Sequence, residues 1–450
     1  MLDTENDFTQ RFERLFLPSL VGERDFGDTY QSYARMNRRR EVVITGLGVV
    51  APNGIGKDVF WTNLAAGKSA IGPISHFDAS AFPCGVAAEI PNFQADAFML
   101  PARAKHRGRF SQFAVAAAKL ALKDALLDIA DFKKINGNRL RIAIGTSMGG
   151  AGDIGEEMRL GFAKDGFKGI PVVSAIEFAS HAAVGHVSVE LGIQGQALTL
   201  GSACTTGLDA VDWAASQIAD GYADLALAGA TDAPLAELAY ATLSALGIFA
   251  SDGVSRPYDL NRTGMVLGEG AAILVLEEED HARARGAPLY ASVLAAGHGN
   301  EGGYGRRTDT AEKALSNAIR TALERAKLNP TDIDYISAHG NGMPDYDLVE
   351  TRAFKDAFGE IAYSIPVSSI KSMIGHAMGA GSVLQVAGSC LTLRHGIIPP
   401  TINLRTQDPE CDLDYVPEKA RGARVRRVLL NAHAMGGTHS VLILGMPAAR

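Results

Sequence analysis

The chain repeats one order of elements twice, and this internal repeat constrains its fold more strongly than any single motif does. Residues 41–48 and 290–299 each have the pattern of a buried strand that ends in glycine. Residues 141–150 (RIAIGTSMGG) and 335–344 (YISAHGNGMP) each combine a strand with a glycine turn. Because strand, glycine turn and helix recur in both parts, the sequence predicts an α/β protein made of two fused, similarly wound units.

The repeat also predicts where the domains begin and end. We expect residues 41–286 to form an N-terminal half and residues 287–450 to form a C-terminal half. Residues 1–40 differ from the rest because they are polar and charged and end in three arginines. We expect them to be an appended N-terminal extension, whose role the sequence does not specify.

Composition excludes several classes of protein. The 450 residues are 47% hydrophobic and 21% charged, which is typical of a globular protein with a sizeable core. The formal net charge of -7 argues against general nucleic-acid binding. The four cysteines lack the density of a disulfide scaffold and favour a reducing cytoplasm. We expect no export signal and no membrane span, because the N-terminus is acidic and no long uncharged apolar run follows.

Cys204 lies at a predicted turn between a strand and a helix. Residues 196–200 have the pattern of a short buried strand, and apolar residues recur at helical spacing from Thr205 onward. The free amides at a helix N-terminus favour a thiolate, which lowers the pKa of a cysteine and makes it a nucleophile. The same amides could hold an oxyanion. On this stretch alone, a small buried core residue is an equally good interpretation of Cys204.

Two histidines occupy related positions in the second half. His339 follows a predicted strand, and His376 lies at the turn into an apolar helix, the position equivalent to Cys204. A lone histidine is usually a satisfied polar group, but two at strand ends, matched to a cysteine at a strand end, indicate a shared cleft. The polar residues that flank them are Asp347, Glu350 and Lys371. Taken singly, such residues are most often surface charges.

Two other kinds of site fit the sequence less well. Gly297, Gly299 and Gly302 form a G-x-G-x-x-G run, but no helix begins directly after it to bind a pyrophosphate. His433 and His439 could be grouped with the other two histidines as metal ligands, yet no carboxylate or cysteine accompanies them at ligand spacing. We therefore expect neither a nicotinamide cofactor nor a metal ion.

A basic cluster lies just ahead of a predicted helix at about residues 111–129. Its members are Arg103, Lys105, Arg107 and Arg109. Such a cluster is most often a solvated face of the protein. At the entrance of a helix it is also a plausible landing site for a negatively charged partner, so both interpretations stay open.

Several motifs together resemble those of the β-ketoacyl-acyl carrier protein synthases, specifically the elongating condensing enzymes with a Cys-His-His site. The motifs are GSACTTG around Cys204, AHGNGMPDYDLVE around His339, KSMIGHAMGAGS around His376 and NAHAMGGTH from Asn431. The resemblance covers about residues 41–444. It implies the thiolase fold, a five-layered α-β-α-β-α arrangement of two similar halves, normally as a homodimer.

The resemblance also implies a reaction. Cys204 would take an acyl chain from the phosphopantetheine of an acyl carrier protein, without a free cofactor. His339 and His376 would hold the malonyl thioester oxygen while carbon dioxide is lost, and the resulting enolate would attack the acyl-Cys204 carbonyl. The backbone amides of Cys204 and Met435 would form the oxyanion hole. The acidic carrier protein would dock on the basic cluster.

Further residues would support this site by resemblance. Lys371 would pair with Glu350 to hold the loops that carry both histidines, and Asp347 would lie beside them. The loop around the pocket would comprise His433, Gly436, Gly437 and Thr438.

The chain departs from the family's pattern at two loops. Residues 341–343 are Asn-Gly-Met, where the family usually has threonines flanking a serine that contact pantetheine. His433 and Met435 stand in place of two phenylalanines, and His439 in place of an asparagine. The second phenylalanine acts as a gate over the acyl pocket. A flexible methionine there favours a specialised fatty acid or polyketide pathway over housekeeping synthesis.

Three other activities remain as alternatives. A non-catalytic partner subunit, such as a chain-length factor, would lack the cysteine. A thiolase acting on coenzyme A thioesters would carry a second cysteine in the C-terminal glycine loop, which has none. An initiating synthase would have a Cys-His-Asn site, whereas His376 indicates the two-histidine type. The sequence leaves open the acyl chain length and unsaturation, the pathway, and the need for a second ketosynthase-like subunit.

Overall fold

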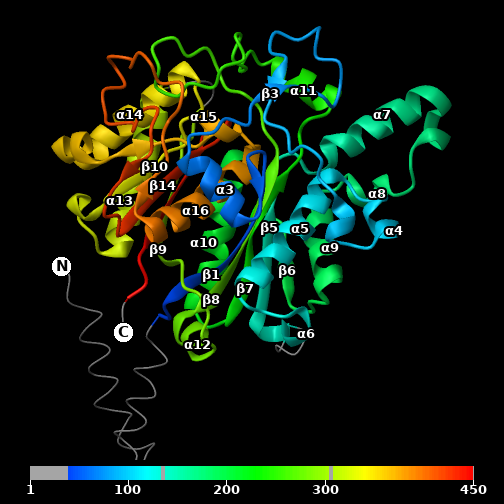
Figure 1. The fold of residues 1–450 in the computed structure, drawn as a ribbon, viewed down its shortest axis with the longest axis horizontal. Coiled ribbons are helices and arrows are strands. Elements are labelled where there is room, and N and C mark those ends of the chain that lie inside the picture. The colour runs from blue at the N-terminus through cyan, green and yellow to red at the C-terminus, as the bar shows by residue number, and fades with distance from the viewer. Residues whose placement is uncertain (1–38, 133–136, 304–307, 449–450) are drawn as a thin grey trace, which may run out of the picture. The chain divides into compact units, whose positions relative to one another are not determined.

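The computed structural model describes residues 39–132, 137–303 and 308–448 (Figure 1). By their contacts, residues 1–40 and residues 41–450 are separate units. The predicted N-terminal extension therefore falls almost wholly outside the described residues, and the fold below is that of the second unit.

One mixed sheet runs through the described part of the chain. Its first half contains, in spatial order, β6 (Gln196–Leu198), β5 (Leu140–Gly145), β7 (Leu225–Asp232), β8 (Gly270–Glu278) and β1 (Val42–Ala51). Its second half continues with β9 (Ala291–Asn300), β15 (Thr438–Gly445), β14 (Arg427–His433), β10 (Tyr335–Ser337) and β11 (Val367–Ser368). Strands β1 and β9 join the halves, and β2 (Gly54–Ile55) pairs with the end of β1.

Both halves follow one topology. In the first half, β1 pairs antiparallel with β8 and β8 with β7, whereas β7 with β5 and β5 with β6 are parallel pairs. In the second half, β9 pairs antiparallel with β15 and β15 with β14, whereas β14 with β10 and β10 with β11 are parallel pairs. The matched segments 41–48 and 290–299 fall in β1 and β9, the first strand of each half. The prediction of two fused, similarly wound α/β units is confirmed.

Helices cover and separate the two halves of the sheet (Figure 1). The central layer is α10 (Thr206–Ala219) and α16 (Met378–His395), which contact each other and both halves. The outer layers are α5 (Arg109–Asp124) and α9 (Ala182–Leu191) on the first half, and α13 (Thr308–Ala326) and α14 (Pro344–Phe358) on the second. Helix α16 is buried from Met378 to Leu393, as befits a helix between two sheets. The predicted five-layered arrangement is confirmed.

Shorter elements connect these layers. They are α3 (Lys57–Ala65), β3 (Gly72–Pro73) with β4 (Val86–Ala87), α4 (Pro101–Ala104), α6 (Ile129–Phe132), α7 (Asp153–Asp165), α8 (Ser174–Glu177), α11 (Glu237–Ser244), α12 (Glu279–Ala284), α15 (Lys371–Ile374) and β12 (Ile397–Ile398) with β13 (Arg421–Gly422). Strand β6 is exposed at Gln196 and Ala197, so the prediction of a buried strand there is wrong. The reason is that β6 ends the sheet and has a neighbour on one side only. Among the described helices, none is long and apolar enough to cross a bilayer.

Glycines in β1 and β9 allow the outer helices to lie directly on the strands. A Cβ atom on Gly48 would collide with the carbonyl oxygen of Ala117 in α5, and one on Gly297 would collide with that of Ala318 in α13. Both contacts are between the first strand of a half and the outer helix that packs on it. The G-x-G of the G-x-G-x-x-G run therefore packs a strand against a helix, which explains it without a dinucleotide.

We expect Gly297→Ala to lower the free energy of unfolding by about 1–3 kcal/mol, because the added methyl group meets helix backbone that cannot rotate away. The measurement is the midpoint of chemical denaturation. The control is Gly185→Ala, an exposed position in α9 where a Cβ atom meets nothing within 4 Å. It should gain about 0.5–1 kcal/mol in the helix. Equal stability of the two variants would contradict the close packing of β9 on α13.

Candidate active site

The cysteine and the two histidines that the sequence singled out line one small cavity. Cys204 comes from the turn before α10, His339 follows β10, and His376 precedes α16. The complete lining is Cys204, Met265, His339, Asn341, Met343, Tyr346, His376, Met378, His433 and Met435. The cavity therefore joins the ends of elements from both halves of the fold, as the sequence predicted for these three residues.

A strained turn presents Cys204 to the cavity. Residues 203–205 form a single 3-10 turn ahead of α10, and Ala203 has a φ of 55°, which is unfavourable for a residue with a Cβ atom. The hydroxyl of Thr206 accepts a hydrogen bond from the amide of Ser202 (2.9 Å) and so fixes the start of the turn. Strain of this kind persists where the surrounding structure enforces it, often at functional sites.

Burial controls the protonation state of Cys204. Desolvation raises its pKa to about 12, whereas the positive charge of Lys371 and the backbone amides of Cys204 and Met435 act in the opposite direction. The predicted lowering of this pKa is therefore wrong. The helix N-terminus does favour the thiolate, but the loss of hydration outweighs it. The resting residue is therefore a thiol.

The two histidines form a pair of neutral imidazoles. Their ring centroids are 5.2 Å apart and the rings are nearly perpendicular, at 87°. Burial, and then the charge of Lys371, lowers the pKa of His376 to about 3 and holds that of His339 well below its ordinary value. Both rings stay uncharged at neutral pH. Each can therefore donate an N–H hydrogen bond to a developing negative charge while it keeps its own proton.

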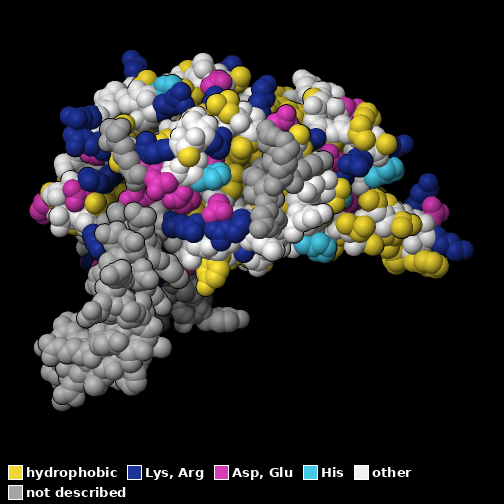
Figure 2. All heavy atoms as spheres, turned by 90° about the horizontal axis from the view of Figure 1, so that it is seen from below, with side chains coloured by type: hydrophobic (Ala, Val, Ile, Leu, Met, Phe, Trp, Pro, Cys, Tyr) yellow, Lys and Arg dark blue, Asp and Glu magenta, His cyan; other side chains and the backbone are white. Residues whose placement is uncertain are grey.

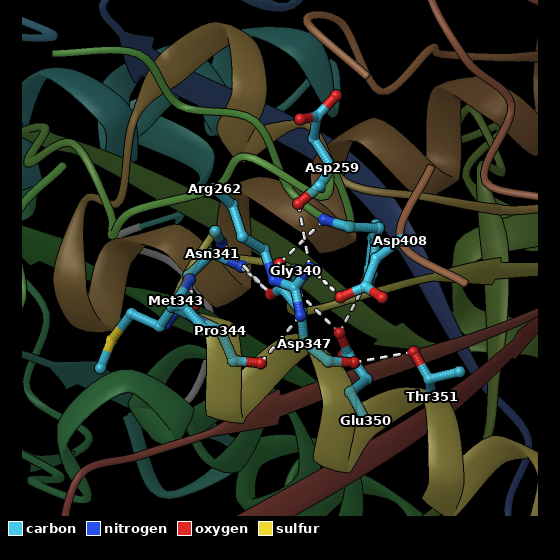
Figure 3. Close-up of polar contacts among 12 residues, drawn as sticks. Asp259, Arg262, Gly340, Asn341, Met343, Pro344, Asp347, Glu350, Thr351 and Asp408 are labelled. Carbon is cyan, nitrogen blue, oxygen red and sulfur yellow. Dashed lines mark hydrogen bonds and ion pairs between the residues drawn. The ribbon is translucent and has the colours of Figure 1, made fainter. Parts of the chain in front are cut away.

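Two buried carboxylates of α14 hold the loop that carries His339. Glu350 accepts hydrogen bonds from the amides of His339 (2.7 Å) and Gly340 (2.9 Å). Asp347 accepts from the amides of Asn341 and Gly342, both at 3.2 Å (Figure 3). Gly340 has a φ of 33°, and a Cβ atom there would lie 2.7 Å from Tyr258 and Ser369. The loop therefore follows one path, set by its hydrogen bonds and its glycine.

Lys371 holds the same loop from the other side. Its ammonium group donates to the carbonyl oxygen of His339 (2.7 Å) and to Oε1 of Gln385 (2.8 Å). The predicted direct pair between Lys371 and Glu350 is wrong, because Glu350 already accepts four donors, the other two being the Tyr258 hydroxyl and the Asn431 amide. The charge of Glu350 still acts on Lys371 at longer range, opposing the burial that lowers its pKa to about 8.

Sequence reasoning missed three buried polar residues that organise the site. Asp232 accepts hydrogen bonds from the amides of Ser147, Met148 and Gly379, so it ties the cavity's walls together across the two halves. Asn431 and Gln385 hold Glu350 and Lys371, as described above. The one signal available was Gln385 itself, a polar side chain in the middle of an apolar helix. No pattern in the sequence indicates that the side chains of Asp232 and Asn431 are buried.

Only part of the predicted pocket loop lines the cavity, and the rest forms the turn between two strands. His433 and Met435 line the cavity. Gly436 (φ 111°) and Gly437 (φ 83°) instead form the turn between β14 and β15, where their backbone angles require glycine. Thr438 begins β15 and is half-buried. These three residues shape the loop but are not among those that line the cavity.

The basic cluster is only partly available to a partner. Arg107 is buried and donates to Glu190 (3.1 Å), and Arg109 forms two hydrogen bonds to the buried carboxylate of Glu269. The charges of these two arginines are used inside the fold, which leaves them less available to a partner, and docking at this cluster stays a prediction. Arg103 is half exposed but also bonds Glu190, and Lys105 is exposed. The spacing of these basic residues in the sequence does not show which side chains are buried and which are exposed.

A cysteine beside two imidazoles that stay neutral is an arrangement that could transfer an acyl group through a thioester. Comparison with known proteins agrees with this chemistry. The beta-ketoacyl synthase N-terminal domain matches residues 39–282, and the C-terminal domain matches residues 290–405.

Individual relatives cover nearly the whole chain. A putative polyketide beta-ketoacyl synthase 1 from Streptomyces halstedii is 40% identical over 91% of this chain and 99% of its own length. The 3-oxoacyl-[acyl-carrier-protein] synthase 2 of Coxiella burnetii is 38% identical over 90% and 98%. The solved structure of the ishigamide ketosynthase/chain length factor has a TM-score of 0.85 at 36% identity, covering 91% of this chain and 100% of its own. The chain belongs to the beta-ketoacyl synthase family and is a ketosynthase, an acyltransferase of the condensing type.

We expect the alkylation rate of Cys204 by iodoacetamide to rise about tenfold per pH unit between pH 7 and 9, because the thiolate fraction grows this way below a pKa of about 12. The adduct is followed by mass spectrometry of the peptide that contains Cys204, with Cys204→Ala as the background. A profile that is flat over this range would show a thiolate at rest and would contradict the effect of burial.

Proposed function

We propose that Cys204 takes an acyl chain from the phosphopantetheine thioester of an acyl carrier protein. The observation that carries this proposal is that Cys204 lines one cavity with His339, His376 and Met435. The backbone amides of Cys204 and Met435 act to lower the pKa of its thiol, as N–H donors near the sulfur do. An oxyanion formed by attack of this sulfur on a thioester would receive both N–H groups. The proton of the thiol would leave with the carrier protein's thiol, so this step needs no charged base.

His339 and His376 then act on the malonyl thioester. Their neutral rings, nearly perpendicular in one cavity, would donate hydrogen bonds to its carbonyl oxygen while carbon dioxide leaves. The enolate carbon attacks the acyl-Cys204 carbonyl, and the chain grows by two carbons. Lys371, Glu350 and Asp347 act as positioning residues, because their contacts are with the loops and not with the cavity.

The pathway is a specialised fatty acid or polyketide pathway. Four methionines line the cavity, and Met435, at the gate position, is 36% exposed and unbranched. Methionine adapts its shape to a ligand more easily than phenylalanine does, so the gate would admit chains of a different size or shape. The relative from Streptomyces halstedii is a putative polyketide synthase. The four cysteines are free thiols, which suits a reducing cytoplasm.

A second ketosynthase-like chain is the partner that the exposed surface favours. The segment of α7 and α8 carries exposed apolar side chains, and Figure 2 shows yellow atoms gathered on the lobe that projects to the right. Its members are Leu160, Phe162, Phe167, Val172, Ile176 and Phe178. Strand β6 forms the edge of the sheet in the same half. The solved ishigamide relative is a ketosynthase/chain length factor, so a heterodimer stands beside the homodimer as a candidate.

The acyl-enzyme is tested by incubating the protein with a panel of acyl carrier protein thioesters and measuring its intact mass. We expect a gain of one acyl group that Cys204→Ala abolishes and that Met435→Phe shifts toward other chain lengths. Absence of an adduct with every donor, even after a candidate second subunit is added, would overturn catalysis and favour a non-catalytic partner subunit. If Met435→Phe accepts the same acyl chains as the native protein, Met435 does not act as a gate that selects the chain.

Docking of the carrier protein is tested at Lys105, the exposed member of the basic cluster. Charge reversal in Lys105→Glu should raise the KM for an acyl carrier protein several-fold, because an acidic partner loses an attraction. Acylation by a small-molecule thioester should not change. The matched control is Lys123→Glu, an exposed lysine in the last turn of α5. Equal KM values for the two variants would place the docking surface elsewhere.

A further inference from the structure

Two histidines beside the active site have no role in the proposed reaction. His433 packs edge-on against His339, with ring centroids 4.2 Å apart, and its amide donates to Nδ1 of His339 (3.5 Å). The ring of His439 lies 5.7 Å from that of His433. Both are almost completely buried. Since a buried imidazole is costly unless its nitrogens are used, the pair calls for an explanation.

The strand register places both rings on one face of a hairpin. His433 of β14 and His439 of β15 are direct cross-strand partners, so their side chains project side by side. Nε2 of His439 lies 3.0 Å from Oε1 of Glu301, whose amide donates to the carbonyl oxygen of Gly437 (2.9 Å). The Glu301 side chain is 18% exposed. The line from Glu301 through His439 to His433 therefore runs from solvent to the cavity.

Two ring nitrogens along this line have no partner within the described part of the chain that would keep them from taking or giving a proton. Nε2 of His433 and Nδ1 of His439 are buried and have no hydrogen-bond partner among the described residues. One water molecule is enough to connect rings at this separation. Burial lowers the pKa of both histidines, so each is neutral and can accept a proton on one nitrogen while releasing one from the other. The titratable groups around the pair are Tyr346, His339, His376, Lys371 and Glu301.

The condensation needs one proton for every turnover. The malonyl carbon–carbon bond breaks, carbon dioxide leaves, and the electron pair becomes the enolate. The enolate carbon bonds to the acyl carbonyl, the carbon–sulfur bond of acyl-Cys204 breaks, and the electron pair stays on the cysteine sulfur. With a pKa of about 12, this buried thiolate is a poor leaving group, so a proton must reach the sulfur as the carbon–sulfur bond breaks. No step of the reaction releases one.

We propose that Glu301, His439 and His433 conduct this proton from solvent to the active-site cavity. The inference rests on the proposed condensation at Cys204 and assigns the two histidines to proton delivery. A metal site does not explain them, because the described residues contain no group of three or more histidine, cysteine, aspartate or glutamate side chains arranged to hold an ion.

The test compares two half-reactions in His439→Asn and Glu301→Gln. Acylation of Cys204 consumes no proton, so its rate, measured by intact mass, should stay within about twofold of the native rate. Condensation with malonyl carrier protein should fall about tenfold or more and should show a larger solvent deuterium isotope effect. A small buffer acid should restore part of the lost rate, because it can deliver the proton directly. The matched control is His298→Asn, a β9 histidine bonded to Asp212 on the sheet's surface, which should behave as native.

The outcomes separate this proposal from the proposed function. Native condensation rates in both variants would overturn the route. Equal losses of acylation and condensation, without an effect of buffer acid, would also overturn it and show that the residues are structural. His433→Phe provides a second approach from inside the cavity, with the same expected loss of condensation. Failure of the native protein to acylate Cys204 would instead overturn the proposed function.

Discussion

The buried carboxylate of Glu350 is the interaction on which the active site most depends. A carboxylate in the protein interior is strongly disfavoured unless its oxygens are fully hydrogen bonded. Here it accepts two loop amides, a tyrosine hydroxyl and an asparagine amide. These donors come from three separate places in the chain, so a single side chain fixes the loop of His339 against β14 and the segment around Tyr258. Loss of any one donor would leave the charge under-solvated, which makes the arrangement cooperative.

The doubled topology explains why the reacting groups converge. The turn of Cys204 in the first half and that of His376 in the second both lead into helices of the central layer, α10 and α16, and these helices pack directly on each other. The site therefore needs neither half to contain a complete set of catalytic groups. Asp232 joins them further, because it binds amides from both halves.

The two similar halves and the grouping of Cys204, His339 and His376 could be predicted because each depends on local pattern and on repetition, and the five layers followed from the family resemblance. The predictions that failed concern properties that depend on how deeply a side chain is buried. The pKa of Cys204 rises since hydration is lost, which no local motif reports. Arg107 and Arg109 turn inward to carboxylates far away in the sequence, and Lys371 finds a carbonyl and an amide because Glu350 is already saturated. The roles assigned to the site residues stay predictions.

The hairpin of β14 and β15 has a consequence for how this protein can change. Its register brings His433 opposite His439, and the intervening turn closes through hydrogen bonds between Ala434, Gly437 and Thr438. Substitutions in this turn alter side chains one at a time. An insertion or deletion of one residue would shift the pairing and reverse the face to which every following side chain points. The length of this loop is therefore much less free to vary than its composition.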